Sequence, residues 1–452
     1  RDVCAARIFV RAGGGEKSNQ NRMQQASQND SNNKGKDSAG GETQVTKKDL
    51  ARALYGARGF REPSEQEKKH TFWNTQPVPQ EERPKDVYGE IEQKKVQEIR
   101  AKPLKLPDAF EWVDCDMEDT KTVDEVYALL NGNYVEDDDS TFRFDYSREF
   151  LKWALMPPGY KREFHVGVKV KKSKKLVGFI TGIPARVHVY DEVKNMVEIN
   201  FLCVHKKLRS KRLAPVLIRE ITRRVNRTDV WQAVYTAGVV LPRPVSRNRY
   251  WHRSLNPKKL IGIGFSRLQH LMTMARTIKL YKVENTPQTP GMRQFNPETD
   301  TKQCQKLLMG YLKKFKLYQE FDEAEFKHWF TPRKDVVHSF VVEDPKSGKI
   351  TDLISFYSLP SSILNHAKYK TLRAAYSFYN VSTKTEWNRL MMDALILASK
   401  AKFDVFNALD VMENGEFLKN LKFGIGDGHL QYYLYNWNCP EMVNNDVGLV
   451  LL

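Results

Sequence analysis

Cysteine is scarce in this chain, and its spacing argues against two of its common uses. The five cysteines lie far apart, at Cys4, Cys115, Cys203, Cys304 and Cys439, and none belongs to a CxxC pair. An odd, scattered set of this kind does not suggest a disulfide framework. The ten histidines are equally dispersed and no HExxH motif occurs, so the sequence indicates no metal site. We expect a reducing, intracellular environment.

Long apolar runs are missing as well. No stretch reaches the length of a membrane-spanning helix. The few apolar residues near the start are interrupted by Arg7, so we expect no secretory signal there. The chain also lacks a GxxxxGK[ST] loop, a GxGxxG stretch between a strand and a helix, and a GxSxG elbow. These absences argue against a P-loop, a dinucleotide site and a serine nucleophile elbow.

Positive charge, by contrast, is abundant. The 452 residues carry 73 Lys and Arg against 55 Asp and Glu, a net charge of +18, while 40% are apolar and 11% aromatic. The apolar share is enough for a large core, and the length is enough for two to four domains. The charge favours an anionic partner, which on composition alone is a nucleic acid, a phosphate-rich cofactor or an acidic membrane surface.

The composition changes along the first hundred residues. Residues 1–45 are rich in Gly, Ser, Asn, Gln and Lys. We predict that they are disordered, because so few apolar residues cannot offset the chain entropy lost on folding. Residues 47–107 are charged and interrupted by prolines, with one aromatic pair, Phe72 and Trp73. We expect this pair to dock onto a neighbouring surface.

From residue 110 onward, the hydrophobic pattern predicts the same order of elements twice, after a first helix at 124–130. The first copy has a hairpin at 164–170 and 176–183, strands at 187–190 and 196–204, a helix at 209–225 and a buried strand at 231–241. The second copy has a hairpin at 339–342 and 350–359, a strand at 374–381, a helix at 387–400 and a strand at 405–409. We therefore predict an α/β (α+β) fold of two similar halves with a ligand cleft between them.

A basic loop follows the buried strand 196–204. Arg209, Lys211 and Arg212 surround the start of the next helix, whose N–H groups at Ser210 to Ala214 are suited to a pyrophosphate. The alternative is a solvated basic turn. A strand, phosphate loop and helix in this order are the hallmark of acetyl-CoA-dependent N-acetyltransferase folds, in which pantetheine inserts between two splayed parallel strands. An acyl-CoA is therefore a better hypothesis than a mononucleotide. The second copy lacks the basic loop.

Three further features each have a functional and a structural interpretation. The acidic run 136–139, with aromatic residues directly after it, either binds a cationic peptide or is a solvated loop. His252 is a base, a substrate contact or a satisfied core histidine, and the core interpretation is favoured. The apolar tail 447–452 either packs inside, which carries the α-carboxylate of Leu452 inward, or forms an edge strand with that carboxylate at the surface.

Several long motifs resemble the eukaryotic protein N-myristoyltransferase (glycylpeptide N-tetradecanoyltransferase) family, from about residue 68 to the end. The motifs are 198–212 (EINFLCVHKKLRSKR), 422–428 (KFGIGDG), 375–381 (AYSFYNV), 72–78 (FWNTQPV), 133–139 (NYVEDDD) and 235–239 (YTAGV). The resemblance implies two fused acetyltransferase-like (GNAT-type) halves related by a pseudo-twofold axis. Here these would be residues 68–265 and 266–452, after a disordered basic leader at 1–67.

The resemblance also implies a myristoyl-CoA site in the first half and a peptide site over the second. The positions that match cofactor contacts are Thr71, Phe72, Trp73, Phe201, Leu202, Cys203, Val204, Arg209, Ser210, Lys211, Arg212, Leu213 and Ala214. Thr71 departs from the residue expected before Phe-Trp. The positions that match peptide contacts are Tyr134, Val135, Glu136, Asp137, Asp138, Asp139, Phe142, Phe144, Tyr146, Asn200, Tyr250, His252, Ser355, Tyr379, Asp427, Gly428 and Leu430. The acidic run would then receive a lysine downstream of the acceptor glycine.

For catalysis, the resemblance implies that the C-terminal carboxylate of Leu452 removes a proton from the N-terminal glycine amine, which Thr236 orients. The amine attacks the thioester without an acyl-enzyme, and the backbone N–H groups of Phe201 and Leu202 stabilise the oxyanion. Cys203 then lines the pocket and is not a nucleophile. A closed pocket selects the chain length, because each buried methylene contributes about 0.8 kcal/mol. The acceptor is a glycine with Ser or Thr four residues on.

Two other functions stay open at this point. One is a short-chain N-acetyltransferase on the same fold, and the other is a non-catalytic basic protein that binds RNA or ribosomes. No recognised nucleic-acid-binding motif supports the second. We expect a monomeric, cytoplasmic enzyme that uses myristoyl-CoA as co-substrate and no metal, with a basic leader that favours ribosomes.

Overall fold

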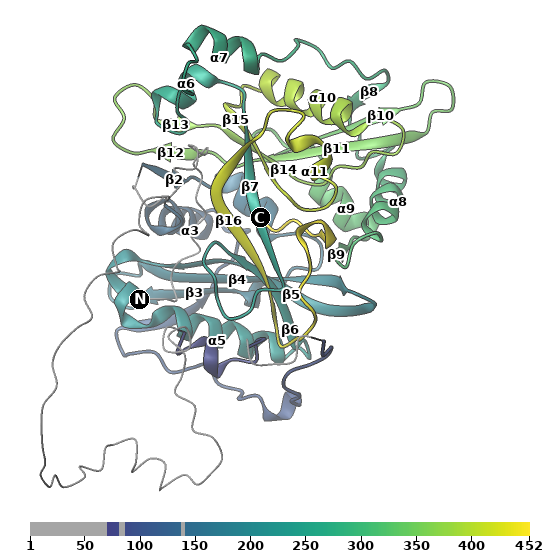
Figure 1. Ribbon diagram of the computed structural model, residues 1–452. Helices are drawn as coiled ribbons and strands as arrows, with labels where there is room; N and C mark the ends of the chain where they lie inside the picture. Colours follow the sequence, from purple (N-terminus) through teal and green to yellow (C-terminus); the bar gives the residue numbers. More distant parts are fainter. Residues whose placement is uncertain (1–69, 81–85, 137–140) are drawn as a thin grey trace, which may run out of the picture. The chain divides into compact units, whose positions relative to one another are not determined.

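A mixed sheet of 14 strands forms the framework of the protein in the computed structural model, which describes residues 70–80, 86–136 and 141–452 (Figure 1). The strands follow the order β1-β3-β4-β5-β6-β16-β7-β15-β14-β11-β10-β8, and β9 and β17 pair beside this path. The predicted leader and Asp137, Asp138 and Asp139 of the acidic run lie outside the described residues.

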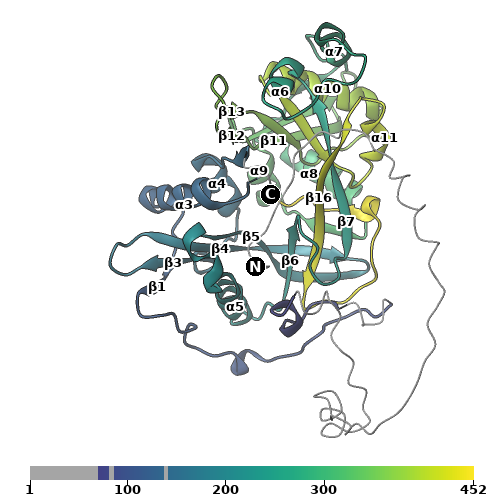
Figure 2. The ribbon, with the colours of Figure 1, turned by 60° about the vertical axis from the view of Figure 1, so that its left-hand side comes forward.

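The first half of the sheet has a helix layer on each face. Its elements are η1 (Trp73–Thr75), η2 (Val96–Glu98), β1 (Phe110–Asp114), α3 (Thr120–Asn133), β2 (Phe142–Phe144), α4 (Arg148–Leu155), η3 (Arg162–Phe164), β3 (His165–Val170), β4 (Leu176–Val189), β5 (Glu192–Val204), η4 (Lys206–Lys211), α5 (Leu213–Asn226) and β6 (Gln232–Ala237). Successive residues of β4 face opposite sides. Phe179 packs with α3, and Ile180 packs with α5. Figure 2 shows α5 on one side of these strands, with α3 and α4 on the other.

The second half repeats this construction with further helices around it. Its elements are β7 (Ser246–Ser254), α6 (Pro257–Gly262), α7 (Met274–Tyr281), β8 (Met292–Gln294), α8 (Thr301–Leu312), β9 (Leu317–Glu320), α9 (Glu323–Phe330), β10 (Val337–Glu343), β11 (Ile350–Ser358), β12 (Ser361–Ile363), β13 (Thr371–Leu372), β14 (Ala374–Ser377), α10 (Trp387–Lys400), β15 (Val405–Leu409), α11 (Gly415–Leu418), β16 (Gly424–Tyr435), η5 (Asn444–Asp446) and β17 (Val447–Gly448).

The predicted repeat is confirmed by the strand pairing. Antiparallel neighbours β3-β4-β5 end in a parallel pair, β5 with β6, and α5 connects the two strands of that pair. In the same way β10-β11-β14 end in the parallel pair β14 and β15, connected by α10. The α/β fold class predicted from the sequence is therefore correct.

Two strands cross between the halves. β7, which follows the first half in the chain, pairs with β15 of the second half. β16, from the end of the chain, pairs with β6 of the first half and also with β7. Each half therefore completes its sheet with the other half's strand. The boundary predicted at 265 and 266 stays a prediction.

Several predicted element ends need correction. The strands expected at 176–183 and 187–190 form the single strand β4, which continues through Pro184 because the antiparallel pairing with β5 is unbroken there. The helix expected from 209 begins at Leu213, because Arg212 adopts a left-handed conformation with φ of 57°. Residues 206–211 form the 3-10 helix η4 instead. The strand expected at 231–241 ends at Ala237.

Other predictions agree more closely. The helix 387–400 and the strand 405–409 match α10 and β15 residue for residue. The helix expected at 124–130 extends over Thr120–Asn133, because the Asp119 side chain caps its first turn by accepting from the N–H groups of Lys121 and Thr122. The strand expected at 374–381 ends at Ser377, where the chain bulges away from β11.

Candidate active site

A bulge in β5 opens the centre of the first half. Asn200 pairs with Thr181 of β4, and Cys203 pairs with Phe179, so Phe201 and Leu202 together oppose a single residue. Phe201 has φ of 52°, in the left-handed region that a bulky residue rarely adopts. β-Bulges of this kind release backbone groups from the ladder and are frequent beside active sites.

The two parallel strands diverge directly beside this bulge. β5 pairs with β6 only from Met196 and Gln232 to Glu198 and Val234. Beyond that point β6 continues to Ala237, paired with β16 on its other edge, and forms no further pairs with β5. The predicted gap between two splayed parallel strands is therefore present.

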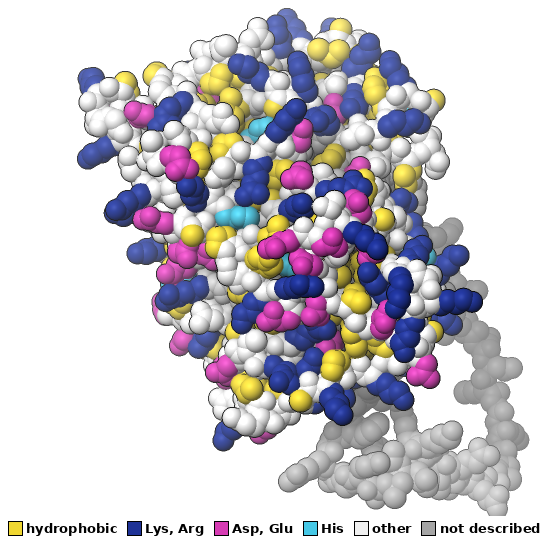
Figure 3. Space-filling model, turned by 180° about the vertical axis from the view of Figure 1, so that it is seen from behind, with side chains coloured by type: hydrophobic (Ala, Val, Ile, Leu, Met, Phe, Trp, Pro, Cys, Tyr) yellow, Lys and Arg dark blue, Asp and Glu magenta, His cyan; other side chains and the backbone are white. Residues whose placement is uncertain are grey.

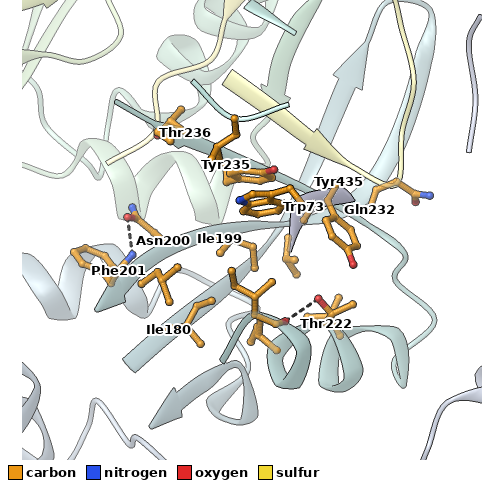
Figure 4. Close-up of a pocket in the computed structure, with 18 of the residues that line it drawn as sticks. Trp73, Ile180, Ile199, Asn200, Phe201, Thr222, Gln232, Tyr235, Thr236 and Tyr435 are labelled. Carbon is orange, nitrogen blue, oxygen red and sulfur yellow. Dashed lines mark hydrogen bonds between the residues drawn. The ribbon is translucent and has the colours of Figure 1, made fainter. Parts of the chain in front are cut away.

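An apolar pocket lies between the diverging strands and α5 (Figure 4). Its lining includes the predicted site residues Trp73, Tyr134, Asn200, Phe201, Leu202 and Thr236. The other lining residues are Ile180, Val197, Ile199, Ile218, Ile221, Thr222, Val225, Asn226, Trp231, Gln232, Ala233, Tyr235, Ala237, Val239, Leu241 and Tyr435. A cavity with so many aliphatic walls suits a hydrocarbon chain.

The N-terminal arm closes one side of this pocket. Trp73 is buried and stacks on Tyr235, with ring centroids 5.7 Å apart (Figure 4). Gln76 accepts a hydrogen bond from the Tyr435 hydroxyl at 3.0 Å, and the Pro77 carbonyl accepts from Asn436 N–H at 2.7 Å. The docking expected for the aromatic pair is therefore confirmed for Trp73.

The apolar tail packs inside the protein. Leu449, Val450 and Leu451 are buried, and Leu452 is partly buried. The Tyr432 hydroxyl donates to the Leu449 carbonyl at 2.7 Å, and the Tyr379 hydroxyl accepts from Val450 N–H at 3.0 Å. Figures 1 and 2 mark the C-terminus inside the fold, near β16. Of the two interpretations of the tail, the inward one is correct.

Asn200 connects this tail to the bulge. Its side-chain N–H donates to an oxygen of Leu452, and its Oδ1 accepts from the Phe201 N–H at 2.8 Å (Figure 4). Among the described residues, no Lys, Arg or His forms an ion pair with the Leu452 carboxylate. Asn200 also lines the pocket, so a single side chain separates the end of the chain from it.

Glu198 is a residue beside the candidate site that the sequence analysis did not single out. Burial raises the pKa of its carboxyl to about 7, although hydrogen bonds from the Leu452 backbone and the Asn200 side chain act in the opposite direction. One signal was available, because Glu198 and Asn200 are polar residues two positions apart in an apolar strand, and therefore share a face. What places them beside the end of the chain is the tertiary structure.

The basic loop presents an uncapped helix. α5 has no side-chain N-cap and no acidic residue in its first turn, so its N-terminal dipole is open to an anion. Lys211 and Arg212 are exposed, Leu213 is partly buried and Ala214 is buried. Arg209 is already engaged, because its guanidinium donates to the Asn133 carbonyl.

The described part of the acidic run is also engaged. Glu136 pairs with Lys206 at 2.8 Å and with Arg143. Burial raises the pKa of Glu136, but hydrogen bonds from Lys206 and Arg143 outweigh it and hold that pKa below its ordinary value. A substrate lysine at Glu136 would have to compete with Lys206 and Arg143. The contact between Glu136 and a substrate lysine stays a prediction.

The aromatic residues after the run gather around Phe201. Tyr146 lies 5.2 Å from Phe201 between ring centroids, and Tyr134 lies 6.0 Å from it. β2, which carries Phe142 and Phe144, pairs with β12 of the second half. These aromatic walls are therefore shared by the two halves.

His252 is buried and neutral. Burial lowers its pKa to about 4, and its Nδ1 lies 2.7 Å from Asn407 Oδ1. A Cβ at Gly426 would lie 2.2 Å from His252 Nε2, so only glycine permits the close approach of β16 there. The core interpretation of His252 is supported, while a contact with substrate is not tested.

The remaining predicted residues are either buried or at least partly exposed. Ser355 and Tyr379 are buried and bonded to each other, since the Ser355 hydroxyl donates to the Tyr379 carbonyl at 2.5 Å. Cys203 is buried with its Sγ 4.0 Å from the Leu129 carbonyl. The other buried positions are Val135, Val204, Tyr250, Gly428 and Leu430, and those at least partly exposed are Thr71, Phe72 and Asp427. Their contacts with substrates stay predictions.

The described residues contain no group of His, Cys, Asp and Glu side chains suited to a metal ion. Within the same residues, every helix is too short or too polar to cross a bilayer. Over the face seen from behind, Lys and Arg side chains lie among fewer Asp and Glu (Figure 3). A positive field of this kind raises the local concentration of anionic ligands.

The site combines two splayed parallel strands, a bulge in one of them, an apolar pocket and an uncapped helix with a basic approach. These features are those of an acyl-CoA-dependent N-acyltransferase. Comparison with known proteins identifies the family. Sequence models of the myristoyl-CoA:protein N-myristoyltransferase N-terminal and C-terminal domains match residues 90–248 and 262–450. The chain belongs to this family and is an acyltransferase.

Individual relatives agree with this assignment. The chain is 58% identical to the glycylpeptide N-tetradecanoyltransferase of Drosophila melanogaster over 386 residues, 85% of this chain and 81% of the relative. It is 55% identical to glycylpeptide N-tetradecanoyltransferase 1 of Arabidopsis thaliana over 400 residues, 87% and 92% of the two chains. The crystal structure of Saccharomyces cerevisiae N-myristoyltransferase with bound myristoyl-CoA matches with a TM-score of 0.81 and 43% identity, covering 85% of this chain and all of the other.

Proposed function

We propose that the protein transfers a myristoyl group from myristoyl-CoA to an N-terminal glycine amine, with the Leu452 carboxylate as general base. One observation carries this proposal. Asn200 bonds both the Leu452 carboxylate and the N–H of the bulge residue Phe201, at the mouth of an apolar pocket. A carboxylate, a backbone N–H and an apolar pocket are thus connected through one side chain, and they would serve as proton acceptor, oxyanion donor and acyl site.

Myristoyl-CoA would bind with its acyl chain in the pocket between β4, β5, β6 and α5. Its thioester would lie at the β5 bulge, and its diphosphate at the N-terminus of α5. The charge of that anion is opposite to the helix dipole and to Lys211 and Arg212. Bringing the apolar chain into the pocket supplies the binding energy that selects its length.

The glycine amine must lose a proton before it can attack. An α-amino group has a pKa near about 8 and is mostly protonated at neutral pH. The Leu452 carboxylate has no cation partner among the described residues, so its negative charge is available to the amine. Thr236 lines the same pocket and would orient the amine.

The oxyanion would be stabilised by the backbone N–H groups of Phe201 and Leu202. In the free protein the Phe201 N–H donates to Asn200 Oδ1. The thioester oxygen would replace that acceptor, and each such donor contributes about 3 kcal/mol to stabilising the transition state. The aromatic residues around Phe201 would form the wall along which the peptide lies.

We also propose that the enzyme acts as a monomer in the cytosol and that the basic leader contacts ribosomes. These statements rest on the resemblance alone, and the leader lies outside the described residues.

The test is the release of CoA thiol from myristoyl-CoA in the presence of a Gly-first octapeptide with Ser at position five and Lys at position seven. Deletion of Leu452 moves the terminal carboxylate back by one residue, about 3 Å. We expect kcat to fall by about a hundredfold or more, the contribution of a positioned general base. Leu452→Ala is the matched control, because it changes the side chain and keeps the carboxylate in place.

Two results would contradict parts of this proposal. Full turnover by the deletion variant would remove Leu452 as the base while leaving the activity intact. Release from acetyl-CoA but not from myristoyl-CoA would favour the short-chain acetyltransferase. An Ala-first peptide, whose Cβ lies beside the attacking nitrogen, should give no release.

A further inference from the structure

A segment of the second half, outside the site described above, exposes apolar side chains to water. It comprises residues 266–282, which are the loop between α6 and α7 together with α7. Leu268, Leu271 and Ile278 of this segment are 43%, 83% and 43% exposed. Figures 1 and 2 show α7 at the outer end of the second half, away from the marked C-terminus. Single exposed apolar residues are ordinary, whereas several in one short segment indicate an interaction surface.

Leu271 is unfavourable in the free protein for two reasons. It is the third residue of a turn in which Met272 N–H donates to the Gln269 carbonyl at 3.1 Å, and its φ is 65°. Glycine or asparagine usually takes this position, because a bulky side chain is crowded in the left-handed region. Most of the Leu271 side chain is also left in water. Neither backbone conformation nor packing within the chain therefore explains a leucine at the tip of this turn.

Basic residues lie between the apolar ones. Residues 230–283 contain no Asp or Glu, and Glu284 is the first carboxylate after α7. Four basic side chains of the segment are exposed, and none of them forms an ion pair within the described part of the chain. They are Arg267, Arg276, Lys279 and Lys282. The segment therefore carries positive charge that no carboxylate of its own offsets.

A neighbouring loop adds charge of the same sign. Residues 364–370 connect β12 to β13, and Tyr369 of this loop lies beside α6, with Lys259 Nζ 5.5 Å from the centre of its ring. Lys368 and Lys370 of the loop are exposed, and the loop contains no Asp or Glu. Two adjoining segments thus form one basic surface.

The packing of α7 decides which of its sides faces outward. Thr277 is the buried residue of the helix. At the helix end, the Arg253 guanidinium donates to the Tyr281 carbonyl at 3.3 Å, which holds α7 against β7. Ile278 and Lys282 are four residues apart, share a side of the helix and are both exposed. An apolar and a basic side chain therefore point together into the solvent.

An apolar tip within a basic surface suits an anionic lipid bilayer. Peripheral proteins bury projecting apolar side chains at the boundary between headgroups and acyl chains, while Lys and Arg are attracted to anionic headgroups. Figure 3 shows hydrophobic side chains beside Lys and Arg at its upper end, the end at which α7 lies in Figure 1. The Asp404 carboxylate at this end does not oppose such an attraction, because it is buried and pairs with Lys259 at 2.6 Å.

We propose that the 266–282 segment is a membrane-docking surface. Leu268, Leu271 and Ile278 enter the boundary region of the bilayer, and the basic residues around them contact anionic headgroups. This binding does not depend on the proposed function. One consequence does, because an enzyme docked in this way would release an acylated product at the surface into which its acyl chain partitions.

The experiment measures co-sedimentation of the full chain with phosphatidylcholine vesicles that contain about 30% phosphatidylserine, and with vesicles of phosphatidylcholine alone. We expect Leu271→Asn to weaken partition into the anionic vesicles about tenfold or more, because a buried leucine is lost. Asparagine suits the left-handed turn, so the thermal midpoint and the kcat/KM with the soluble octapeptide should not fall. Val443→Asn is the matched control, since Val443 is 61% exposed outside the segment and should leave partition unchanged.

A second pair of variants tests the charge. Lys279→Gln combined with Lys282→Gln should weaken partition about twentyfold, since each Lys near an anionic surface contributes about fivefold. Lys302→Gln combined with Lys306→Gln on α8 is the control, because these lysines are also exposed.

Three results would overturn the proposal. The first is equal partition of the unchanged protein into anionic and neutral vesicles. The second is partition into anionic vesicles that Leu271→Asn leaves unchanged. If the variant of Lys279 and Lys282 alone weakens partition, the surface attracts polyanions such as RNA and does not insert into lipid. The third is a loss of the same size in the Lys302 and Lys306 control, which would assign the binding to overall charge.

Discussion

Glu198 links the stability of the protein to pH through a single carboxyl. Its raised pKa, about 7, means that the folded protein binds a proton at this site which the unfolded chain has already lost. Between an ordinary carboxyl pKa near about 4.5 and 7, the folded state therefore holds more protons than the unfolded state. The contribution of Glu198 to the free energy of unfolding should therefore decrease as the pH rises through this window, because the carboxylate charges in a poorly solvated position.

We expect Glu198→Gln to abolish this decrease. The amide has the same shape and no charge, so the free energy of unfolding should fall less between pH 5 and pH 8 than in the unchanged protein. The difference should be at most about 3 kcal/mol. Urea unfolding at the two pH values measures it, with the exposed Glu441→Gln as the control. An identical pH dependence in Glu198→Gln and the unchanged protein would show that Glu198 is charged throughout.

The pocket proposed for the acyl chain lies between β4, β5, β6 and α5, and we expect the separation of these elements to decide how long a chain fits. Ala233 of β6 lines the pocket and is 7% exposed. A larger side chain there would occupy space that the acyl chain needs. We therefore expect the small residue at this position to influence which acyl-chain length fits.

We expect Ala233→Leu to shift the preference from C14 to C12. Each methylene excluded from the pocket forfeits about 0.8 kcal/mol, or about fourfold in binding. The ratio of kcat/KM for the C12 and C14 acyl-CoA substrates should therefore rise about fourfold or more. Ala408→Leu is the control, because Ala408 is a buried residue of β15, the counterpart of β6 in the second half. A similar rise in both variants would point to general loosening rather than to the pocket.

At the scale of the whole molecule, the exchange of β7 and β16 joins the halves. β7 hydrogen-bonds to β15, and β16 hydrogen-bonds to both β6 and β7. Neither half can keep its sheet if the other unfolds. Cooperative unfolding of this kind is otherwise typical of single small domains.

We expect one calorimetric transition for the chain, with equal van't Hoff and calorimetric enthalpies. Fragments 68–265 and 266–452, expressed separately, should each lack a native circular dichroism spectrum, since each would expose an unpaired edge strand. Two separate transitions, or a fragment that folds alone, would show that the halves are independent domains.

Much of the fold follows from the sequence because hydrophobic periodicity is a local property. α10 and β15 were predicted to the residue. The sequence of hairpin, strand, helix and strand was predicted in both halves, although the strands expected at 176–183 and 187–190 form one strand and β12 and β13 were not predicted. Predictions failed at places where one residue changes the backbone direction, as at Arg212 and after Ser377. No periodicity marks such a residue, because its conformation is stabilised by neighbours elsewhere in the chain.

The residue types of the site, and their family, were visible in motifs such as 198–212. Their arrangement was decided by tertiary contacts. Asn200 meets the Leu452 carboxylate across 252 residues of chain, and Asp352 reaches the loop at 383–385 from another strand. Local patterns specify which face of an element is apolar, whereas only the packing of the elements determines which polar groups on those faces come within hydrogen-bond distance.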